Sequence, residues 1–590
     1  MISTKAQSLI YILIGIICLG VLPGMQAVSP TPDGAYPNFT TAEGQNALQG
    51  LTTGAGNTAL GAFSLFGTTT GSFNTAVGAL ALDLNTGDNN TAVGVASLLL
   101  NTGTNNTAVG VDALGLNTTG AFNAAVGAFA LYNNTTGGQN TATGEAALFS
   151  NTTGQNNTAT GFEALLFNTG SDNTANGVNA LYNNTTGGQN TATGEQALLN
   201  NTTGSNNTAT GVGALQSNTT GSGNTANGTD ALFNNTADAN TAVGNGALFS
   251  NTTGVSNTAI GAAVLHDNTT GFDNTATGIL ALTSNTEGLQ NTATGGAALQ
   301  FNLTGSNNTA DGTGALNSNT TGSNNTATGL DALVSNNGDD NTADGFAALF
   351  ANTTGVQNTA VGKNALVNNV SGGNNTAAGF NTLQSNTTGF FNAAIGNNAL
   401  ANNTSGSSNV ALGFSAGSLA TTGNSNVYIG SVQGVAGESN ACYIASIFNQ
   451  LTSGGTQVFV NSDGKLGTTP SSRRFKDDIK PMEDSSEAIL ALKPVTFHYK
   501  KDPQAIPQFG LVAEDVAAVN RNLVFCDKEG QINSVRYEAI NAMLLNEFLK
   551  EHKKVERLEA TVAVLAEKLE QVSAHVEMNA PPVRVAAENR

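Results

Sequence analysis

The stretch Asn140–Asn156, NTATGEAALFSNTTGQN, is one copy of a repeat that fills most of this 590-residue chain. Its opening pentad, Asn-Thr-Ala-x-Gly or a close variant, starts 23 times between Asn57 and Asn426, at intervals of 16 or 17 residues. With Asn140 as position 1, alanine stands at position 3 in the first 22 copies, glycine at position 5 in all 23 and leucine at position 9 in the first 21. A fixed period of this length indicates a solenoid in which each repeat forms one coil.

The two repeat lengths differ mostly in one turn, where Asn-Thr-Thr-Gly becomes Asn-Thr-Gly, as at Asn168–Gly170. Length variation is tolerated in surface turns, whereas the apolar positions keep their places. Side chains alternate along a strand, so the pentad predicts position 3 inside a narrow coil and position 4, which varies from Val77 to Asp311, in water. Parallel strands stack about 4.8 Å apart, which predicts a rod of roughly 100 Å with asparagine and threonine ladders along it.

The leucine of position 9 gives each coil one large apolar side chain. Its complete burial is worth roughly 1.5–3 kcal/mol, whereas each ordered residue costs about 1–2 kcal/mol of backbone entropy. A solenoid made by one chain therefore looks marginal, and we expect three chains that share their leucine rows.

Three other interpretations of the repeat stay open. Asn-x-Thr is also the sequon for N-glycosylation, and seven copies with threonine at positions 2 and 4 suggest an ice-binding array. Calcium-binding repeats place an aspartate in every coil, but here Asp339, Asp340 and Asp344 cluster only once. A ladder in register accounts for the asparagines and threonines without sugar, ice or calcium, and is the prediction.

Charge and proline divide the chain into two kinds of sequence. Residues 28–465 hold 21 acidic residues and only two bases, Lys363 and Lys465, whereas residues 466–590 hold 19 acids and 17 bases. No proline lies between Pro37 and Pro470, so every ladder donor of the repeat is kept. The near absence of bases excludes nucleic-acid binding by the repeat tract.

The N-terminus predicts export. Lys5 precedes an uncharged run of 14 residues, Leu9–Leu22, which is short for a transmembrane helix and suits a secretory signal. We expect a signal peptide over residues 1–27 and a secreted or cell-surface protein. An uncleaved membrane anchor is the alternative, because Met25 stands where cleavage favours a small residue. Beyond the signal only Cys442 and Cys526 remain, too few for a disulfide scaffold.

After Asn409 the repeat decays, and bulkier residues predict a strand-rich neck over residues 431–470. The segment PSSRRFKDDIK follows at residues 470–480. A strand is expected at 494–500 and a turn into a helix at 509–516. An apolar seam at three- and four-residue spacing then runs from Leu544 to Val576, which predicts a coiled coil over 540–576.

The linked order Ser-x-x-Arg-x-Lys, Gly-Leu-Val-Ala-Glu-Asp-Val, Val-Arg-Tyr and coiled coil, over residues 471–576, resembles the endosialidase-type intramolecular chaperone domain. That domain ends phage tail spikes and many bacterial fibre proteins. The repeats at 57–430 are similar to the β-roll head of trimeric autotransporter adhesins, although that family's repeat is shorter. Together the resemblances imply a homotrimer that the C-terminal domain assembles and from which it then cuts itself.

The chaperone resemblance implies Ser471 as nucleophile, Lys476 as its base and Pro470–Ser471 as the scissile bond. Ser472 is the competing nucleophile, but only Ser471 lies three residues before Arg474 and five before Lys476. A serine hydroxyl needs an adjacent base, and lysine is a known variant of that base. Lysines are protonated in neutral water, so burial or a neighbouring cation such as Arg474 is expected to free the amine. The alternative is a basic linker whose serines cap a helix.

These predictions combine into one fold and one function. The fold class is mainly β: a long solenoid of 16–17-residue coils, trimeric, with a C-terminal α+β domain that ends in a trimeric coiled coil. The domains expected are a signal peptide (1–27), an N-terminal leader (28–56), the solenoid (57–430), a neck (431–470) and the chaperone domain (471–590).

The function expected is that of an exported fibre or adhesin-like surface protein whose serine endopeptidase acts once, in cis. The alternatives are an adhesin with a permanent C-terminal trimer clamp and a phage-type tail fibre. A cell-surface or glycan ligand is the further partner class. No metal or cofactor is expected, because the four histidines have no metal-ligand spacing and no nucleotide-binding motif is present.

Overall fold

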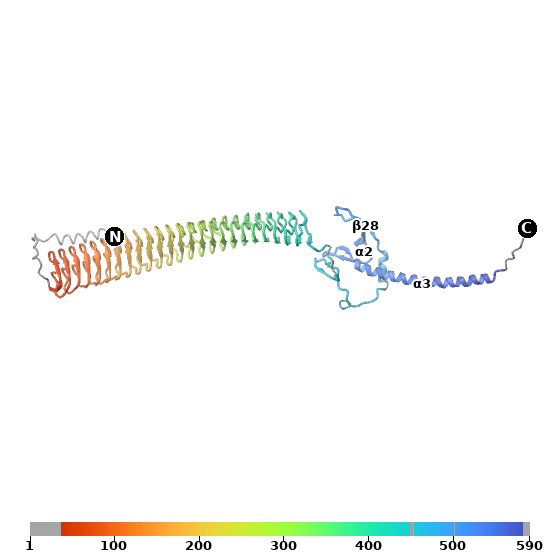
Figure 1. Ribbon diagram of the computed structural model, residues 1–590, viewed down its shortest axis with the longest axis horizontal. Coiled ribbons are helices and arrows are strands. Elements are labelled where there is room, and N and C mark those ends of the chain that lie inside the picture. Colours follow the sequence, from red (N-terminus) through yellow and green to blue (C-terminus); the bar gives the residue numbers. More distant parts are fainter. Residues whose placement is uncertain (1–36, 449, 451–452, 501, 582–590) are drawn as a thin grey trace. The chain divides into compact units, whose positions relative to one another are not determined.

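The computed structural model describes residues 37–448, 450, 453–500 and 502–581. Contacts divide the chain into two units, residues 1–449 and 450–590 (Figure 1). The predicted signal peptide lies outside the described residues. None of the helices in the described ranges is long and apolar enough to cross a membrane.

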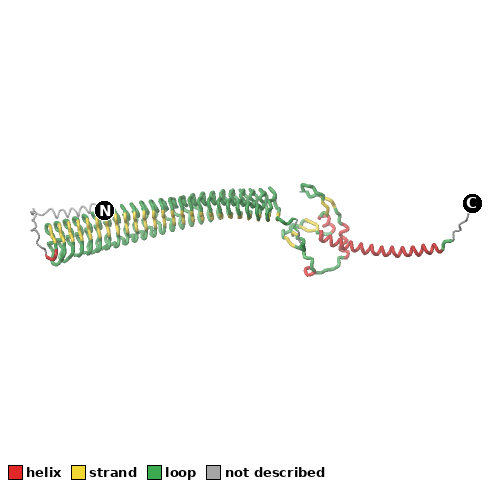
Figure 2. Tube along the Cα trace, in the orientation of Figure 1, coloured by secondary structure: helices red, strands yellow, loops and turns green. Residues whose placement is uncertain are grey.

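The first unit is a parallel β-solenoid, as predicted. Each coil contributes one three-residue strand, and each strand pairs in register with those of the neighbouring coils, so that the strands form one 25-stranded sheet (Figure 2). A short 3₁₀ helix, η1 (Pro37–Phe39), precedes them. The strands are β1 (Thr41–Glu43), β2 (Thr58–Leu60), β3 (Thr75–Val77), β4 (Thr91–Val93), β5 (Thr107–Val109), β6 (Ala124–Val126), β7 (Thr141–Thr143), β8 (Thr158–Thr160), β9 (Thr174–Asn176), β10 (Thr191–Thr193), β11 (Thr208–Thr210), β12 (Thr225–Asn227), β13 (Thr241–Val243), β14 (Thr258–Ile260), β15 (Thr275–Thr277), β16 (Thr292–Thr294), β17 (Thr309–Asp311), β18 (Thr326–Thr328), β19 (Thr342–Asp344), β20 (Thr359–Val361), β21 (Thr376–Ala378), β22 (Ala393–Ile395), β23 (Val410–Leu412), β24 (Val427–Ile429) and β25 (Cys442–Ile444).

The ladder extends past both limits expected for the solenoid. β1 lies within the expected leader, residues 28–56, and pairs Ala42 with Ala59. At the other end β25 lies within the expected neck, residues 431–470, and pairs Tyr443 with Tyr428. Both outer coils lack the asparagine of position 1 but keep the alternation of a strand, with an inward residue at position 3.

A single chain fills the interior of each coil. In the coil that begins at Asn140, the side chains of Ala142, Ala147 and Leu148, at positions 3, 8 and 9, are fully buried. The same holds for the leucines of position 9 from Leu65 to Leu400. The expectation that three chains share the leucine rows is therefore wrong, because these rows expose no surface that a second chain could cover.

In most coils two buried asparagines, at positions 1 and 12, complete this interior, and the expectation of a marginal single-chain solenoid leaves out their hydrogen bonds. Asn140, at position 1, donates from Nδ2 to Asn123 Oδ1 at 3.1 Å and to Gly154 O at 2.9 Å, and its own Oδ1 accepts from the backbone N–H of Asn157 at 3.0 Å. Asn151, at position 12, donates to Asn134 Oδ1 at 2.9 Å and to Gly154 O at 3.0 Å. Buried amides are stable when hydrogen-bonded, and a repeat in register supplies most of them with a partner from a neighbouring coil. Asn151 Oδ1 is an exception and has no hydrogen-bond partner in the described structure.

The buried ladder also bears on the sequons. Asn151 begins the sequon Asn-Thr-Thr, yet its side chain is fully buried and hydrogen-bonded. An asparagine so placed cannot accept a glycan while the coil is folded. The asparagine–threonine pattern at position 12 therefore has a structural cause.

The C-terminal end of the solenoid is closed by an aromatic residue. Tyr428 takes the inward position that alanine holds in earlier coils, is fully buried, and stacks on Tyr443 with 5.8 Å between ring centroids. Position 9 is glycine in the coil of Tyr428 itself (Gly434) and in the coil before it (Gly417). A side chain at either glycine would meet the Tyr428 ring. The tyrosine thus occupies the volume that two leucines vacate.

The second unit is α+β. It contains two-residue strands β26 (Phe459–Val460) and β27 (Leu466–Gly467), the hairpin-paired strands β28 (Val495–Phe497) with β29 (Gln508–Gly510) and β30 (Val524–Cys526) with β31 (Ile532–Val535), the 3₁₀ helices η2 (Arg473–Phe475), η3 (Glu483–Ala491) and η4 (Arg521–Leu523), and the α-helices α2 (Ala513–Val519) and α3 (Tyr537–Met578).

The core of this unit is small. Its buried apolar residues are Val516, Leu523, Val524, Val535 and Met543. The seam predicted as a coiled coil lies on α3 and is exposed along its length, from Leu544 at 58% to Val576 at 64%. In coiled coils, other helices cover an apolar seam of this kind.

Candidate functional site

The residues predicted to cut the chain lie on an exposed loop at the start of the second unit. A single 3₁₀ turn, η2, follows Ser472 and is closed by the backbone bonds Phe475 N to Ser472 O at 3.0 Å and Lys476 N to Arg473 O at 3.2 Å. This turn reverses the chain between Ser471 and Lys476. Two residues five apart in the sequence are thereby brought face to face.

The structure brings the predicted nucleophile and base into hydrogen-bonding distance. Lys476 Nζ donates to Ser471 Oγ at 3.1 Å, within the range expected for a nucleophile and its base. Pro470, Ser471 and Lys476 are all exposed in the single chain. The geometry permits proton transfer between hydroxyl and amine, and the catalytic roles themselves stay predictions.

The other two residues singled out from the sequence lie apart from this contact. The Arg474 guanidinium stacks over the Phe475 ring, 4.5 Å from its centroid. Ser472 holds the N-cap position of η2 but makes no side-chain capping hydrogen bond. The interpretation of the serines as helix caps therefore finds no support at Ser472.

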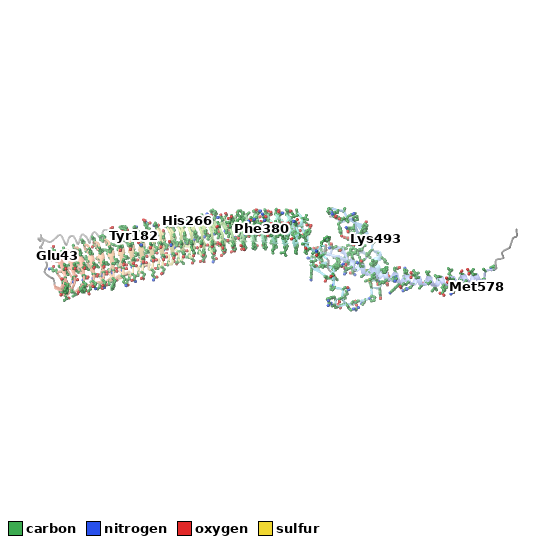
Figure 3. The ribbon with its side chains drawn as sticks, in the orientation of Figure 1. Glu43, Tyr182, His266, Phe380, Lys493 and Met578 are labelled. Carbon is green, nitrogen blue, oxygen red and sulfur yellow. The ribbon has the colours of Figure 1, made fainter. Side chains whose placement is uncertain are left out.

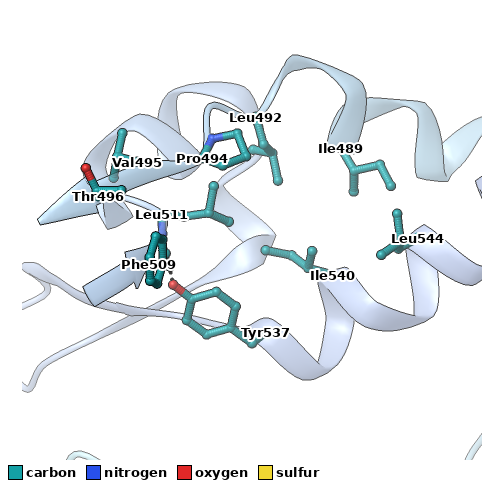
Figure 4. Close-up of a pocket in the computed structure, with 11 residues that line it drawn as sticks. Ile489, Leu492, Pro494, Val495, Thr496, Phe509, Leu511, Tyr537, Ile540 and Leu544 are labelled. Atoms are coloured by element: carbon teal, nitrogen blue, oxygen red, sulfur yellow. Dashed lines mark hydrogen bonds between the residues drawn. The ribbon is translucent and has the colours of Figure 1, made fainter. Parts of the chain in front are cut away.

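Sequence analysis missed an apolar groove in the second unit. Residues from η3, β28, β29 and α3 line a depression of about 660 Å³, in which Leu492, Leu511 and Ile540 point toward one another (Figure 4). The Tyr537 hydroxyl accepts a hydrogen bond from Leu511 N at 3.0 Å and fixes the start of α3 against β29. Leu544, the first seam residue, also lines the groove, so the groove and the seam form one apolar surface.

A polar cluster fixes η3 against α3 and could not be foreseen from spacing. Ser486, fully buried, donates to Glu547 and accepts from Asn546 Nδ2 at 2.7 Å. Lys550 Nζ lies 2.9 Å from Glu547 and 3.4 Å from Asp484. The hydrogen bond from Ser486, followed by that from Lys550, lowers the pKa of Glu547, and the bond to Glu547 raises the pKa of Lys550. The cluster joins segments about sixty residues apart.

On the outer surface of the solenoid some aromatic side chains contact those of neighbouring coils, whereas others, such as Phe73 and Phe122, stay largely exposed. Aromatic side chains of successive coils stack on one another, as Tyr132 does on Phe149 at 5.5 Å and Phe249 on His266 at 5.1 Å between ring centroids. Figure 3 labels His266 of this stacked pair and Tyr182, whose ring instead meets that of Phe167 edge-on at 5.3 Å between centroids. Rings that cover each other's faces leave mainly their edges to solvent. Within the described residues no group of three or more His, Cys, Asp or Glu is placed to hold a metal ion.

Comparison with known proteins gives a match in the second unit. Residues 471–525 match a peptidase family model described as the chaperone of endosialidase. No curated protein and no solved structure matches the chain. The chain thus carries a chaperone-of-endosialidase segment after a long β-solenoid, and the matched segment starts at Ser471 and ends within β30.

Proposed function

We propose that this protein is an exported trimeric fibre whose C-terminal unit assembles three chains and then cuts itself off before Ser471. The family match over residues 471–525 supports an assembly chaperone of the self-cleaving kind. The observation that carries the proposal furthest is the 3.1 Å contact between Lys476 Nζ and Ser471 Oγ. Export rests on the predicted signal peptide over residues 1–27.

The position of the nucleophile beside the scissile bond defines the chemistry. Lys476 accepts the hydroxyl proton as Ser471 Oγ attacks the carbonyl carbon of Pro470. The C–N bond of that peptide breaks, its nitrogen takes the proton, and Pro470 is left as an ester on Ser471 Oγ. Water then hydrolyses the ester, which yields a carboxylate on Pro470 and a free hydroxyl and amino terminus on Ser471.

Assembly supplies what the isolated site lacks. Ser471 and Lys476 are exposed in one chain, whereas a lysine acts as a base when apolar or cationic surroundings disfavour its protonated form. Three α3 seams that pack together would bring three second units into contact and cover this loop. Cleavage would then follow assembly, and removal of the helper would leave a kinetically trapped fibre.

The test compares three chains by mass spectrometry: the wild type, Ser471→Ala and Ser472→Ala. The wild type and Ser472→Ala should release the 120-residue fragment 471–590, and Ser471→Ala should stay whole. Hydroxylamine added during cleavage should convert the ester to a hydroxamate on Pro470. A fragment from Ser471→Ala, or none from Ser472→Ala alone, would contradict the assignment.

A permanent trimer clamp is the second candidate, favoured by the exposed α3 seam, which needs partners whether or not the chain is cut. It predicts trimers that remain intact in all three chains. A phage-type tail fibre shares the architecture but would not need the export signal.

Replacement of residues 1–27 would therefore leave the maturation of a phage-type fibre unchanged and would prevent that of an exported fibre.

A further inference from the structure

The outward face of the solenoid sheet changes character in its last four coils. From β1 to β21, position 2 is threonine in every strand except β6, which has Ala124. Position 4 is mixed over the same coils and includes Asp311 and Asp344. In β22–β25 both outward columns become apolar or cysteine: Ala393 and Ile395, Val410 and Leu412, Val427 and Ile429, and Cys442 and Ile444.

This change does nothing for the chain's own core. The inward residues of β22–β24, which are Ala394, Ala411 and Tyr428, are buried and complete the interior. The outward side chains stay exposed or half-buried, with Ile395 and Leu412 at about half of their surface and Ala393 and Val427 partly covered. In β2–β5 position 4 is also apolar, but threonine stands beside it at position 2. β6, with Ala124 and Val126, is the one earlier strand that is apolar in both columns. Four successive coils that are apolar in both columns leave a continuous apolar face without a partner in one chain, which makes it a candidate contact surface.

We infer that the outward sheet face of β22–β25, the terminal face, is where copies of this chain touch one another, and that β1–β21 stand apart as separate arms. The inference rests on the proposed trimer and adds where the solenoids meet. It replaces the shared leucine rows, which are buried within each coil.

Charge favours other copies of the chain as the occupant. Residues 392–448 contain one charged residue, Glu438, so like faces meet there without repulsion. Around a three-fold axis each residue lies near its own copies. The same contact farther along the sheet would set Asp311 and Asp344 against their equals, which is unfavourable.

The size of the terminal face explains why it needs the helix. Four rows about 4.8 Å apart and two columns wide cover roughly 200 Å² in plan, well below the roughly 800 Å² per partner of a stable interface. Chains already gathered by α3 have a local concentration in the millimolar range. We therefore expect the α3 seam to gather the chains first and the terminal face to extend the contact. The coils of the terminal face are those that directly precede the second unit in sequence.

Cysteine crosslinking tests the position of the contact. Cys442 lies on the terminal face and is a free, exposed thiol. In a Ser471→Ala chain with Cys18 and Cys526 replaced by serine, a short bis-maleimide should join Cys442 of neighbouring copies. Two matched chains carry Cys442→Ser and one new cysteine each: Thr191→Cys at position 2 of β10, and Leu565→Cys on the α3 seam.

The expected result is crosslinking at Cys442 and Leu565→Cys and at least a tenfold lower yield at Thr191→Cys. Crosslinking at Leu565→Cys without Cys442 would overturn the inference and leave the proposed trimer intact. Equal yield at Thr191→Cys would also overturn it, because the solenoids would then touch along their length. No crosslinking at any site would contradict the trimer itself.

A charge on the terminal face provides the second test. Leu412→Asp should reduce the Cys442 crosslink at least fivefold while the Leu565→Cys crosslink persists. Thr210→Asp, at the equivalent position 4 of β11, is the matched control and should leave both unchanged. An undiminished Cys442 crosslink in Leu412→Asp would contradict the inference, and unaltered far-ultraviolet circular dichroism checks that the coils remain folded.

Discussion

The solenoid and the second unit bury their apolar residues in opposite ways. In the solenoid, Leu148 and its equivalents are fully buried by one chain. In the second unit five apolar residues are buried, and a 42-residue helix leaves its seam in water. The difference teaches that the solenoid fills its own interior with one chain, whereas the second unit leaves an apolar seam that the proposed trimer would cover. The proposed contacts between copies are thus concentrated at the C-terminal end.

The largest effect should come from the α3 seam. Leu558→Glu with Leu565→Glu places charge on residues that are over half exposed in one chain and that other helices would bury. We expect a threefold fall in mass by light scattering, because a buried unpaired carboxylate is strongly unfavourable. Solenoid circular dichroism should not change.

The control for that experiment is the pair Ala560→Glu and Ala574→Glu, on the same helix but away from the seam. These chains should keep the mass of the parent. A seam variant that stays trimeric would show that α3 does not hold the copies together.

A smaller effect is expected at the aromatic plug of the solenoid. Tyr428→Ala removes a fully buried ring and should cost about 3–5 kcal/mol of local stability, because the cavity cannot collapse. Hydrogen exchange of β23–β25 measures this loss. Mass and cleavage report on the second unit and should change much less.

The sequence offers its own rescue for this variant. Gly417 has a φ of 63°, close to the 50–56° of the leucines at position 9 in earlier coils. Gly417→Leu should therefore clash with the ring in the parent chain and recover part of the lost stability in Tyr428→Ala. If the two substitutions were additive, the ring would not occupy the place of the leucines.

The smallest effect concerns a buried carboxyl. Burial raises the pKa of Asp83 to about 6, and in the described structure its Oδ1 has no hydrogen-bond partner. Because the folded coil binds this proton more tightly than the unfolded chain, stability falls as pH rises from about 4 to about 6. Asp83→Asn should gain about 1 kcal/mol at pH 7.5, a value discounted for partial exposure.

Hydrogen exchange across residues 67–100 at pH 7.5 and pH 4 measures the gain, which should shrink at the lower pH. Asp311→Asn, on the exposed face, is the control and should show no such dependence. An equal gain at both pH values would mean that ionisation of Asp83 is not the cause.

The sequence predicts the coil well where one residue type repeats. The alanine of position 3, the leucine of position 9 and the strand between positions 2 and 4 all follow from spacing. The inward asparagines of positions 1 and 12 do not, because a lone buried amide is unfavourable and only a stack of copies satisfies it. The backbone conformation of the leucines cannot be predicted from the repeat either. Their φ lies between 50° and 56° in all 21 copies, a region that costs about 1–2 kcal/mol for such a residue.

The candidate site shows a similar division. The spacing of Ser471 and Lys476, taken with the resemblance, anticipates their contact, because one turn of η2 suffices to bring them together. The cluster of Ser486, Asn546 and Glu547 could not be anticipated, since it joins residues about sixty apart with no local signal. Long-range pairs of that kind depend on how α3 packs against η3, which no pattern in either segment encodes.

The register of the asparagine ladder has a consequence for the reach of the molecule. Each coil presents to the next coil the same amides, carbonyls and apolar side chains that the previous coil presents to it. Tyr428 covers the C-terminal end of this stack. A coil inserted or deleted anywhere between β2 and β22 would change the length by about 4.8 Å and disturb neither terminus. The length of the solenoid can therefore change in equal steps, one coil at a time, while the end coils and the second unit keep their sequences.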